Sequence, residues 1–361
     1  MNDADAQALP LRIVSEPPSP RFLGLTVDER NARVMKRAAA TGTLIVPPGV
    51  AITPALVQAL PRANGVWHLV WDSGRPPIVW TANGDTSTTA STARVAEGLV
   101  FDVSTRAARR QASWRLLRAS GKPTDGWLAR HIHRRISRVF SYVLLRLGLK
   151  ANHATFLTLL VGVVCAWLVA QTSRETFIAG CLVFWFASIA DGIDGEMARL
   201  TLTESEWGEQ LDTAVDFATF LLCYVGILVG WWRQGIGPAG WTLGVGTAVA
   251  VLITVFWGMH VVRRARDQHD RVFVDTKPIE IGVRDAARAT GAPMLRLAAA
   301  TFVLFRREAF SLSFVALSLI TGWRGVIVLA LLVGLAIVSL TLIVYGTPIE
   351  RAIRARNRAG V

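Results

Sequence analysis

Six apolar runs after residue 150 restrict what this chain can fold into. They cover residues 154–171, 176–192, 212–232, 241–262, 308–322 and 325–346. Each run is near the ~20 residues that an α-helix needs to cross a bilayer. We therefore expect a mainly α-helical membrane protein with a bundle of six transmembrane helices, and an even number of spans returns the chain to its starting side.

Composition separates a front part from this membrane part. The 361 residues are 52% hydrophobic, and the mean hydropathy of +0.39 is too high for an ordinary globular protein. The first 120 residues, however, are not apolar enough to span a membrane. Their patterns predict helices at 26–39 and 54–60 and strands at 43–46 and 66–71. We expect a small N-terminal α/β cytoplasmic domain at residues 1–120.

The segments that join these parts are polar or amphipathic. Residues 86–94, rich in Thr, Ser and Ala, predict a flexible loop, and residues 106–125 predict a basic linker. Residues 128–148 predict an amphipathic helix on the membrane surface, since Ile132, Ile136, Val139, Val143 and Leu147 share one stripe. The expected division of the chain is 1–120, 121–150 (linker and juxtamembrane helix), 151–346 (six-span catalytic domain) and 347–361 (basic tail).

Basic residues predict the orientation of the spans. They are concentrated before the first span, between the fourth and fifth spans, and in the tail, whereas the opposite loops offer only Arg174, Arg233 and Arg324. By the positive-inside rule, both termini and the acidic motif face the cytoplasm, in an inner or cytoplasmic membrane. The net charge of +13 predicts attraction to anionic lipids and phosphorylated substrates. Nucleic acid is not expected as a partner, because the charge is juxtamembrane and not interleaved with stacking aromatics.

Two pairs of aspartates follow and precede apolar runs at helical spacing. Asp191 and Asp194 are three residues apart, and Asp212 and Asp216 are four apart, so each pair shares one helix face. Four carboxylates brought together repel one another unless cations bind between them. Oxygen ligands favour Mg²⁺ or Mn²⁺, and a pair of such ions is a common device for activating an attacking oxygen beside a leaving phosphate.

Small and basic residues accompany the first pair. Gly195 and Ala198 present almost no side chain and leave room for a nucleotide against the helix, and Arg199 can supply a counter-charge for phosphate. Acidic residues near helix ends can also be caps or solvated loop charges. Here both pairs border apolar runs directly, which favours a membrane-edge site.

The residues Asp191-x-x-Asp194-Gly195-x-x-Ala198-Arg199, then eight residues, then Gly208-x-x-x-Asp212-x-x-x-Asp216 resemble the complete signature of the CDP-alcohol phosphotransferases. The resemblance covers roughly residues 122–346. It implies that the four aspartates hold two divalent ions, that the segment from Asp191 to Arg199 cradles the CDP moiety, and that Asp216 accepts the proton of the acceptor hydroxyl. The hydroxyl then attacks the β-phosphate and CMP leaves. It also implies a homodimer.

The roles of three further features are open to more than one interpretation. Asn152 and Thr155 resemble a polar pair that the family places near its nucleotide site, and Asn152 alone also fits a helix N-cap. Arg306 and Arg307 are either snorkelling anchors or ligands for an acceptor phosphate. The front domain faintly resembles a reduced nucleotidyltransferase, as in di-myo-inositol-phosphate-phosphate synthase-like fusions, although no Gly-rich phosphate loop precedes its first helix.

The substrates are less constrained than the chemistry. The family at large favours CDP-diacylglycerol in phospholipid biosynthesis, and the front domain favours a soluble donor such as CDP-inositol in phosphodiester biosynthesis. The acceptor is an alcohol or a phosphorylated alcohol. A membrane transporter or scaffold that uses the acids for ion coupling or packing is the alternative from a different functional class.

Overall fold

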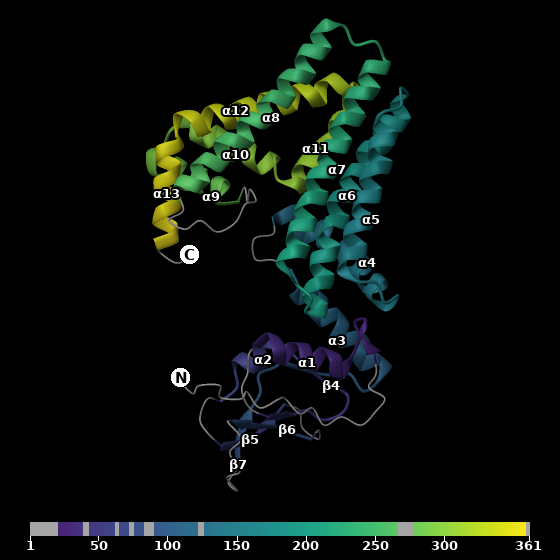
Figure 1. Cartoon of the computed structure of the whole chain (residues 1–361), viewed down its shortest axis with the longest axis vertical. Helices are drawn as coiled ribbons and strands as arrows, with labels where there is room; N and C mark the ends of the chain where they lie inside the picture. The colour runs from purple at the N-terminus through teal and green to yellow at the C-terminus, as the bar shows by residue number, and fades with distance from the viewer. Residues whose placement is uncertain are drawn as a thin grey trace, which may run out of the picture. The chain divides into compact units, whose positions relative to one another are not determined.

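The computed structural model describes residues 21–38, 43–61, 65–71, 76–82, 90–121, 126–265 and 277–358, most of them in helices (Figure 1). The described chain forms two compact units. The first takes in the described residues up to Gly126, with Arg134–Ala154 and Gly192–Glu206; the second takes in Trp127–His133, Thr155–Asp191 and Trp207–Val361. Each unit is described by itself below.

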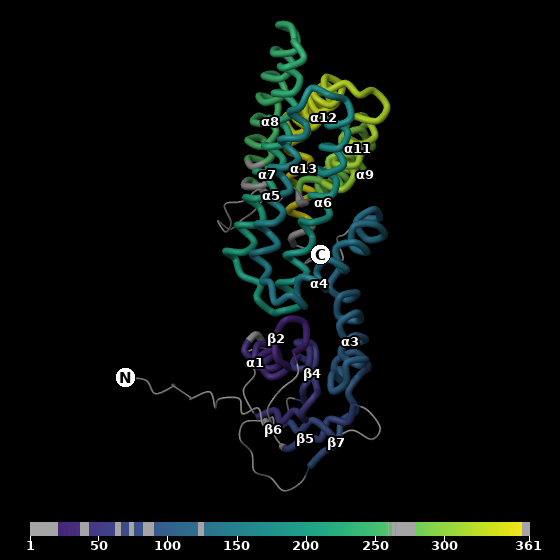
Figure 2. The backbone as a smooth tube through the Cα atoms, turned by 90° about the vertical axis from the view of Figure 1, so that its right-hand side faces the viewer, coloured from purple at the N-terminus to yellow at the C-terminus, as the bar shows by residue number. Residues whose placement is uncertain are grey.

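The N-terminal part of the first unit contains a four-stranded mixed sheet, traced as a tube in Figure 2. The strand order is β3-β6-β5-β7; β5 is antiparallel to β6 and parallel to β7. Two short antiparallel pairs, β1–β2 and β4–β8, complete the strands. The bounds are β1 Arg21–Phe22, β2 Leu25–Thr26, β3 Thr43–Ile45, β4 Val50–Ile52, β5 Gly65–Val70, β6 Ile78–Ala82, β7 Ala90–Arg94 and β8 Val100–Asp102.

Helices α1 (Val27–Ala38) and α2 (Pro54–Gln58) pack onto these strands. α1 begins with a capping box: the backbone N–H of Thr26 donates to the Glu29 carboxylate at 2.9 Å, and the N–H of Glu29 donates to the Thr26 hydroxyl at 3.2 Å. The first of these bonds lowers the pKa of Glu29. The shared core contains Val34, Met35, Leu44, Val50, Ile52, Leu56, Val57, Leu69, Ile78 and Trp80. Both expected helices and both expected strands are present, with ends shifted by one or two residues.

Two expectations about irregular segments were wrong where the structure describes them. Residues 106–119 of the expected linker form helix α3 (Arg106–Ala119), whose first turn is capped by the Thr105 hydroxyl; residues 122–125 lie outside the described residues. Within the expected loop 86–94, Ala90–Arg94 is strand β7, because it pairs in parallel with strand β5 of the sheet; residues 86–89 lie outside the described residues.

The expected juxtamembrane helix is present in two parts. A π-helical turn, η1 (Ala129–His133), leads into α4 (Arg134–Arg146). The side chains of Val139, Val143 and Leu147 are exposed at 49%, 47% and 70%. The opposite face, with Arg134, Ser137, Ser141 and Leu145, is buried. An apolar outer stripe on a helix with a polar buried face is typical of an interfacial helix.

Five helices in the described part of the chain are long and apolar enough to cross a membrane. They are α5 (Ala151–Val169), α6 (Arg174–Thr201), α7 (Glu206–Arg233), α8 (Pro238–Ala265, qualifying over Pro238–Gly258) and α12 (Arg324–Val344). The expected span at 308–322 is a helix of 15 residues, α11 (Arg307–Thr321). At 1.5 Å per residue it reaches roughly 22 Å, less than the ~30 Å of a hydrocarbon core.

The region between α8 and α11 holds helices that were not expected. α9 (Lys277–Thr290) and α10 (Pro293–Leu304) pack against each other, and α9 also packs against α13 (Gly346–Arg358). α8 lies along α12 (Figure 1). The aliphatic positions Ile279, Val283, Ala286 and Ala287 of α9 are buried in the core that these helices share. A second core joins α5, α6, α7, α11 and α12 through residues such as Phe177, Cys223, Ile227, Phe314 and Ile327.

Candidate active site

Helix α6 carries the whole first half of the acidic signature. It runs unbroken over 28 residues, from an apolar first half into Asp191, Asp194, Gly195, Ala198 and Arg199. The helix ends with a left-handed residue, Leu202 (φ 56°), and the N–H of Thr203 donates to the carbonyl of Ala198 at 2.9 Å. This 6→1 bond is the Schellman pattern that terminates helices. The first half of the signature therefore occupies the last three turns of one regular helix.

Helix α7 carries the second half. It begins at Glu206, so Gly208 lies in its first turn, and Asp212 and Asp216 follow on one face at a spacing of four. The short turn from Leu202 to Ser205 joins the two helices. As expected from the sequence, both acidic pairs are on helices.

Three of the four aspartates meet at one point. One carboxylate oxygen from each of Asp191, Asp212 and Asp216 lies within 4.8 Å of the others, and all three side chains are half-buried. Asp194 follows Asp191 by three residues on α6, is 6% exposed, and accepts the backbone N–H of Gly195 at 2.6 Å. Three carboxylates this close form a donor set of hard oxygens, which fits Mg²⁺ or Mn²⁺.

A cationic side chain lies against this cluster. Arg307, the first residue of α11, places Nη1 at 2.6 Å from Asp191 Oδ1 and also forms an ion pair with Asp216. Neighbouring carboxylates disfavour one another's charge, so a positive group between them is stabilising. Arg307 supplies that charge here, at the place where a metal ion fits by its donor chemistry.

The adjacent Arg306 has a different partner. Its Nη2 and Nε donate to the carboxylate of Glu280 on α9, with the shortest contact at 2.6 Å. The hydrogen bond to Glu280 raises the pKa of Arg306. The two arginines that the sequence treated alike are therefore distinct: Arg306 ties α9 to the start of α11, and Arg307 reaches the acids.

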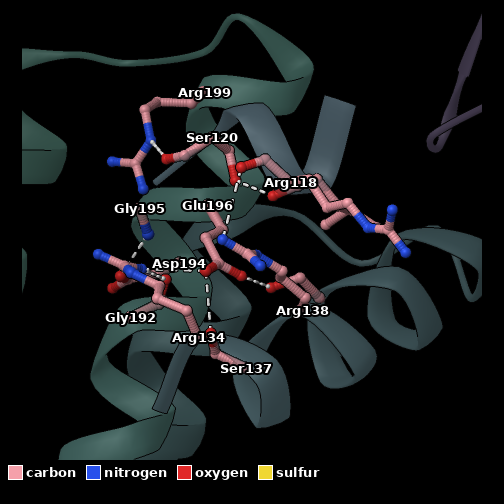
Figure 3. A network of polar contacts seen from close by, with 12 residues as sticks. Arg118, Ser120, Arg134, Ser137, Arg138, Gly192, Asp194, Gly195, Glu196 and Arg199 are labelled. Carbon is pink, nitrogen blue, oxygen red and sulfur yellow. Dashed lines mark hydrogen bonds and ion pairs between the residues drawn. The ribbon is translucent and has the colours of Figure 1, made fainter. Parts of the chain in front are cut away.

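A buried glutamate inside the signature was missed by the sequence reasoning. Glu196 is fully buried and accepts hydrogen bonds from three side chains of α4. Figure 3 shows Arg134, whose Nη1 donates at 3.0 Å, and Ser137, whose Oγ donates at 2.9 Å; the third donor is Ser141 Oγ at 2.8 Å. A signal was present, because Arg134, Ser137 and Ser141 recur at helical spacing opposite the apolar stripe. These contacts fasten the juxtamembrane helix to the back of α6.

The small residues of the signature make room for Arg199. A Cβ atom added to Gly195 would lie 3.2 Å from Arg199 Nη1, tighter than ordinary contact. Arg199 Nε donates to the backbone carbonyl of Ser120, just after α3, at 3.0 Å (Figure 3). Gly195 thus leaves space for the guanidinium to lie along the helix, and Ala198, with only a methyl side chain, adds little bulk to the same stretch.

A family model for CDP-alcohol phosphatidyltransferases matches residues 149–337, just over half of the chain and the whole signature. The chain belongs to this family. It is an integral membrane transferase that moves a phosphate group from a CDP-alcohol, and membership favours this over the transporter or scaffold hypothesis. Family members generally depend on divalent metal ions, and the cluster of Asp191, Asp212 and Asp216 supplies carboxylates of the required kind.

Two curated relatives share the name bifunctional IPC transferase and DIPP synthase. The protein from Thermococcus kodakarensis is 34% identical over 142 residues, which cover 37% of this chain and 32% of the relative. The protein from Archaeoglobus fulgidus is 35% identical over 125 residues, 34% of this chain and 24% of the relative. The chain matches about a third and about a quarter of the length of these relatives.

In this phosphotransferase the first helix of the front domain holds the end of the signature helix. Arg30 donates to the carbonyl of Leu200, and Arg33 Nη1 donates to the carbonyl of Thr201 at 2.9 Å. The last carbonyls of a helix lack intrahelical partners and carry partial negative charge, so two arginines there are stabilising. Burial lowers the pKa of Arg30 to about 10, and the group stays charged at neutral pH. Sequence reasoning did not find this contact, which joins residues about 170 positions apart.

The polar pair Asn152 and Thr155 lies at the start of the first span, α5. Asn152 is an exposed residue inside the first turn of α5, which begins at Ala151, so Asn152 is not the residue that precedes the helix. Thr155 is 4% exposed. A contact of either with a nucleotide stays a prediction.

Proposed function

We propose that the protein transfers a substituted phosphate group from a CDP-alcohol to a hydroxyl acceptor, with release of CMP, at a site centred on Asp191, Asp212 and Asp216. The convergence of these three carboxylates around the Arg307 guanidinium is the observation that supports this most strongly. We take it as a cation site, because it lies on two helices that carry a complete family signature.

Asp191, Asp194, Asp212 and Asp216 would together hold two divalent ions, Mg²⁺ or Mn²⁺. Asp194 joins the set in this proposal because it follows Asp191 by one helical turn. When bound, the ions would neutralise charge on the diphosphate and favour departure of CMP.

The chain's own residues would carry the other roles. Asp216 accepts the proton of the acceptor hydroxyl, which then attacks the β-phosphate. Arg199 offers its guanidinium to the diphosphate, and Gly195, Ala198 and Gly208 leave space for the CDP moiety. Asn152 and Thr155 are proposed as further contacts to the nucleotide.

Arg307 is the better of the two candidates for a phosphate ligand. Arg306 is engaged by Glu280, whereas Arg307 pairs with acids that a metal ion would take over. Released from them, its guanidinium is free to bind a phosphorylated acceptor near the same point. We assign this role to Arg307 and a structural role to Arg306.

The donor is proposed as a water-soluble CDP-alcohol such as CDP-inositol, with CDP-diacylglycerol as the other donor to test. The IPC transferase and DIPP synthase named for the two relatives support the first choice. The front domain contains a mixed sheet, and CTP binding would test whether it keeps any nucleotidyltransferase property.

The test is CMP release by purified protein in detergent with Mn²⁺ or Mg²⁺, offering both donors against free and phosphorylated alcohols. We expect metal-dependent CMP release with one donor, and its loss in Asp216→Asn. Asp285→Asn is the matched control, since it makes the same change at a residue of α9 that pairs with Arg288 at 3.8 Å. Normal release by Asp216→Asn would refute its assignment as the base, and silence with every pair would refute the proposed reaction.

Orientation and assembly complete the proposal. The basic segments predict that both termini and the acids face the cytoplasm, which requires α11 to cross the membrane as a short sixth span. Alkaline phosphatase fused after residue 358 should then be inactive. The exposed apolar stripe of α5, with Phe156, Leu160, Val163 and Trp167, is available to lipid or to a second copy in the family's expected homodimer. Cross-linking through a cysteine placed at residue 160 would give a covalent dimer if that stripe is the interface.

A further inference from the structure

A basic pocket lies in the first unit, and none of its lining residues belongs to the signature. It has a volume of about 740 Å³, and it is formed by the β1–β2 hairpin, the start of α3 and the end of α4. Five of its twelve lining residues are arginines: Arg21, Arg106, Arg109, Arg110 and Arg146. The described lining holds no Asp or Glu.

The start of α3 concentrates positive charge in this pocket. Helix N-termini carry partial positive charge and favour acidic residues in the first turn. α3 has no acidic residue there and instead places Arg106, Arg109 and Arg110 in its first five positions. Such an arrangement repels itself, and an anion with several oxygen acceptors relieves that repulsion.

The walls of the pocket are held by contacts within the unit. Arg109 Nη1 donates to the carbonyls of Val103 and Ser104 at 3.0 and 2.9 Å. The Arg146 guanidinium lies 5.5 Å from the centre of the Tyr142 ring, which in turn stacks on Trp114 at 5.5 Å. These contacts orient two of the five guanidinium groups before any ligand binds.

The hairpin closes the pocket from the other side. Gly24 has φ +79°, and a Cβ atom there would lie 3.1 Å from the carbonyl oxygen of Leu145. Only a residue without a side chain tolerates both the positive φ and this approach to α4. The hairpin therefore brings Arg21 close to the end of α4.

One end of the pocket is close in sequence to the first spanning helix. Gly148, which lines it, is three residues before α5, the first spanning helix. Val139 and Val143 of α4, and Leu147 just after it, are exposed on the stripe that an interfacial helix lays against lipid. An interfacial helix lies where both lipid headgroups and soluble metabolites present phosphate groups.

We propose that this pocket is a binding site for a phosphate group, held by the arginines of the β1–β2 hairpin, α3 and α4. Forked guanidinium groups match phosphate oxygens in pairs. The volume admits a headgroup or a phosphorylated small molecule, and both sources present the same chemistry to the arginines. The site shares no residue with the acidic signature and does not depend on the proposed transfer reaction.

The test uses the full chain in detergent and measures dissociation constants by microscale thermophoresis. One arm titrates dioctanoyl phosphatidic acid, with dioctanoyl phosphatidylcholine as the zwitterionic comparison; the other titrates inorganic phosphate and pyrophosphate. Tight binding in the first arm alone identifies a lipid headgroup site, and tight binding in the second identifies a soluble phosphate site. Either result supports the proposal, and failure of both arms overturns it.

Substitutions inside and outside the pocket test whether the phosphate group binds there. Arg106→Gln/Arg110→Gln is expected to weaken binding about tenfold or more, because charge-assisted hydrogen bonds are lost. Arg115→Gln/Arg118→Gln makes the same charge change on the exposed face of α3 outside the pocket and should change affinity less than about twofold. Equal loss in both variants would mean general attraction to a basic protein and would overturn the site. Unchanged melting temperatures show that both variants fold.

Discussion

Replacing Glu196 by glutamine should destabilise the protein, because it removes the negative charge of a buried ion pair with Arg134. The carboxylate is fully buried, and the Arg134 side chain that faces it is 11% exposed. Glutamine keeps the shape and one acceptor oxygen, so Arg134 and Ser137 retain a partner and the new amide can donate to Ser141. What disappears is the negative charge beside a buried guanidinium.

The cost follows from that remaining positive charge. Removing one partner of a buried ion pair typically costs 3–5 kcal/mol, and the retained hydrogen bonds place Glu196→Gln near the lower end, about 3 kcal/mol. Ser141→Ala removes one hydrogen bond to a charged group and should cost about 1.5–2 kcal/mol. Glu175→Gln makes the same chemical change at an exposed position in the first turn of α6 and should stay within about 0.5 kcal/mol of the wild type.

Chemical unfolding in a mild detergent, followed by tryptophan fluorescence, would measure these differences. The combined variant Arg134→Met/Glu196→Gln should recover most of the loss, because the buried guanidinium that faced the lost carboxylate is gone as well. If Glu196→Gln is as stable as Glu175→Gln, or if Arg134→Met adds a further full loss, the ion pair does not fasten α4 to α6 as described.

Three other substitutions test contacts of the same kind. Arg307→Ala should destabilise the metal-free protein by about 1–2 kcal/mol, since the pair with Asp191 and Asp216 is partly exposed, and Mn²⁺ should restore the loss in a melting experiment; no Mn²⁺ response would contradict the cation role. Arg30→Met should cost about 1–3 kcal/mol and speed amide exchange at Thr203, because α6 loses a cap on its last carbonyls; unchanged exchange would refute the cap. Arg324→Met should lower the melting temperature, because the buried guanidinium donates to the carbonyls of Val169 and Gln171 at the end of α5 and lies 4.3 Å from the centre of the Phe177 ring. An unchanged melting temperature would show that these contacts are dispensable.

Local patterns in the sequence predicted much of the fold. The spans α5, α6, α7, α8 and α12 follow from long apolar runs, which have few alternatives to a membrane helix. The helix α1 and the strand β5 follow from hydrophobic periodicity. The positions of Asp191, Asp212 and Asp216 on two adjacent helices follow from spacing alone.

Other elements depend on packing that composition conceals. α3 is rich in arginine and was expected to be a linker, yet Ala112 and Leu117 are buried on it and Thr105 caps it. α9 lies in the stretch between the fourth and fifth expected spans, which was considered only for its basic residues, although Ile279 and Val283 already show the helical period of a buried face. In both cases charge outweighed a short apolar stripe in the reading of the sequence.

Long-range polar contacts could not be predicted from one sequence. The partners of Glu196 are about 55 to 62 residues away, and those of Arg30 about 170. The choice between Arg306 and Arg307 was undetermined as well, because it depends on Glu280, which lies on an unexpected helix. These contacts require the positions of several helices at once.

The most direct test of the central claim is the binding of Mn²⁺ to the full chain in detergent, followed by electron paramagnetic resonance alongside CMP release. We predict two bound ions per chain, loss of at least one in Asp212→Asn with a parallel loss of CMP release, and normal binding in Asp285→Asn. Equal Mn²⁺ binding by the wild type and Asp212→Asn, or full CMP release after all metal is chelated, would contradict the account.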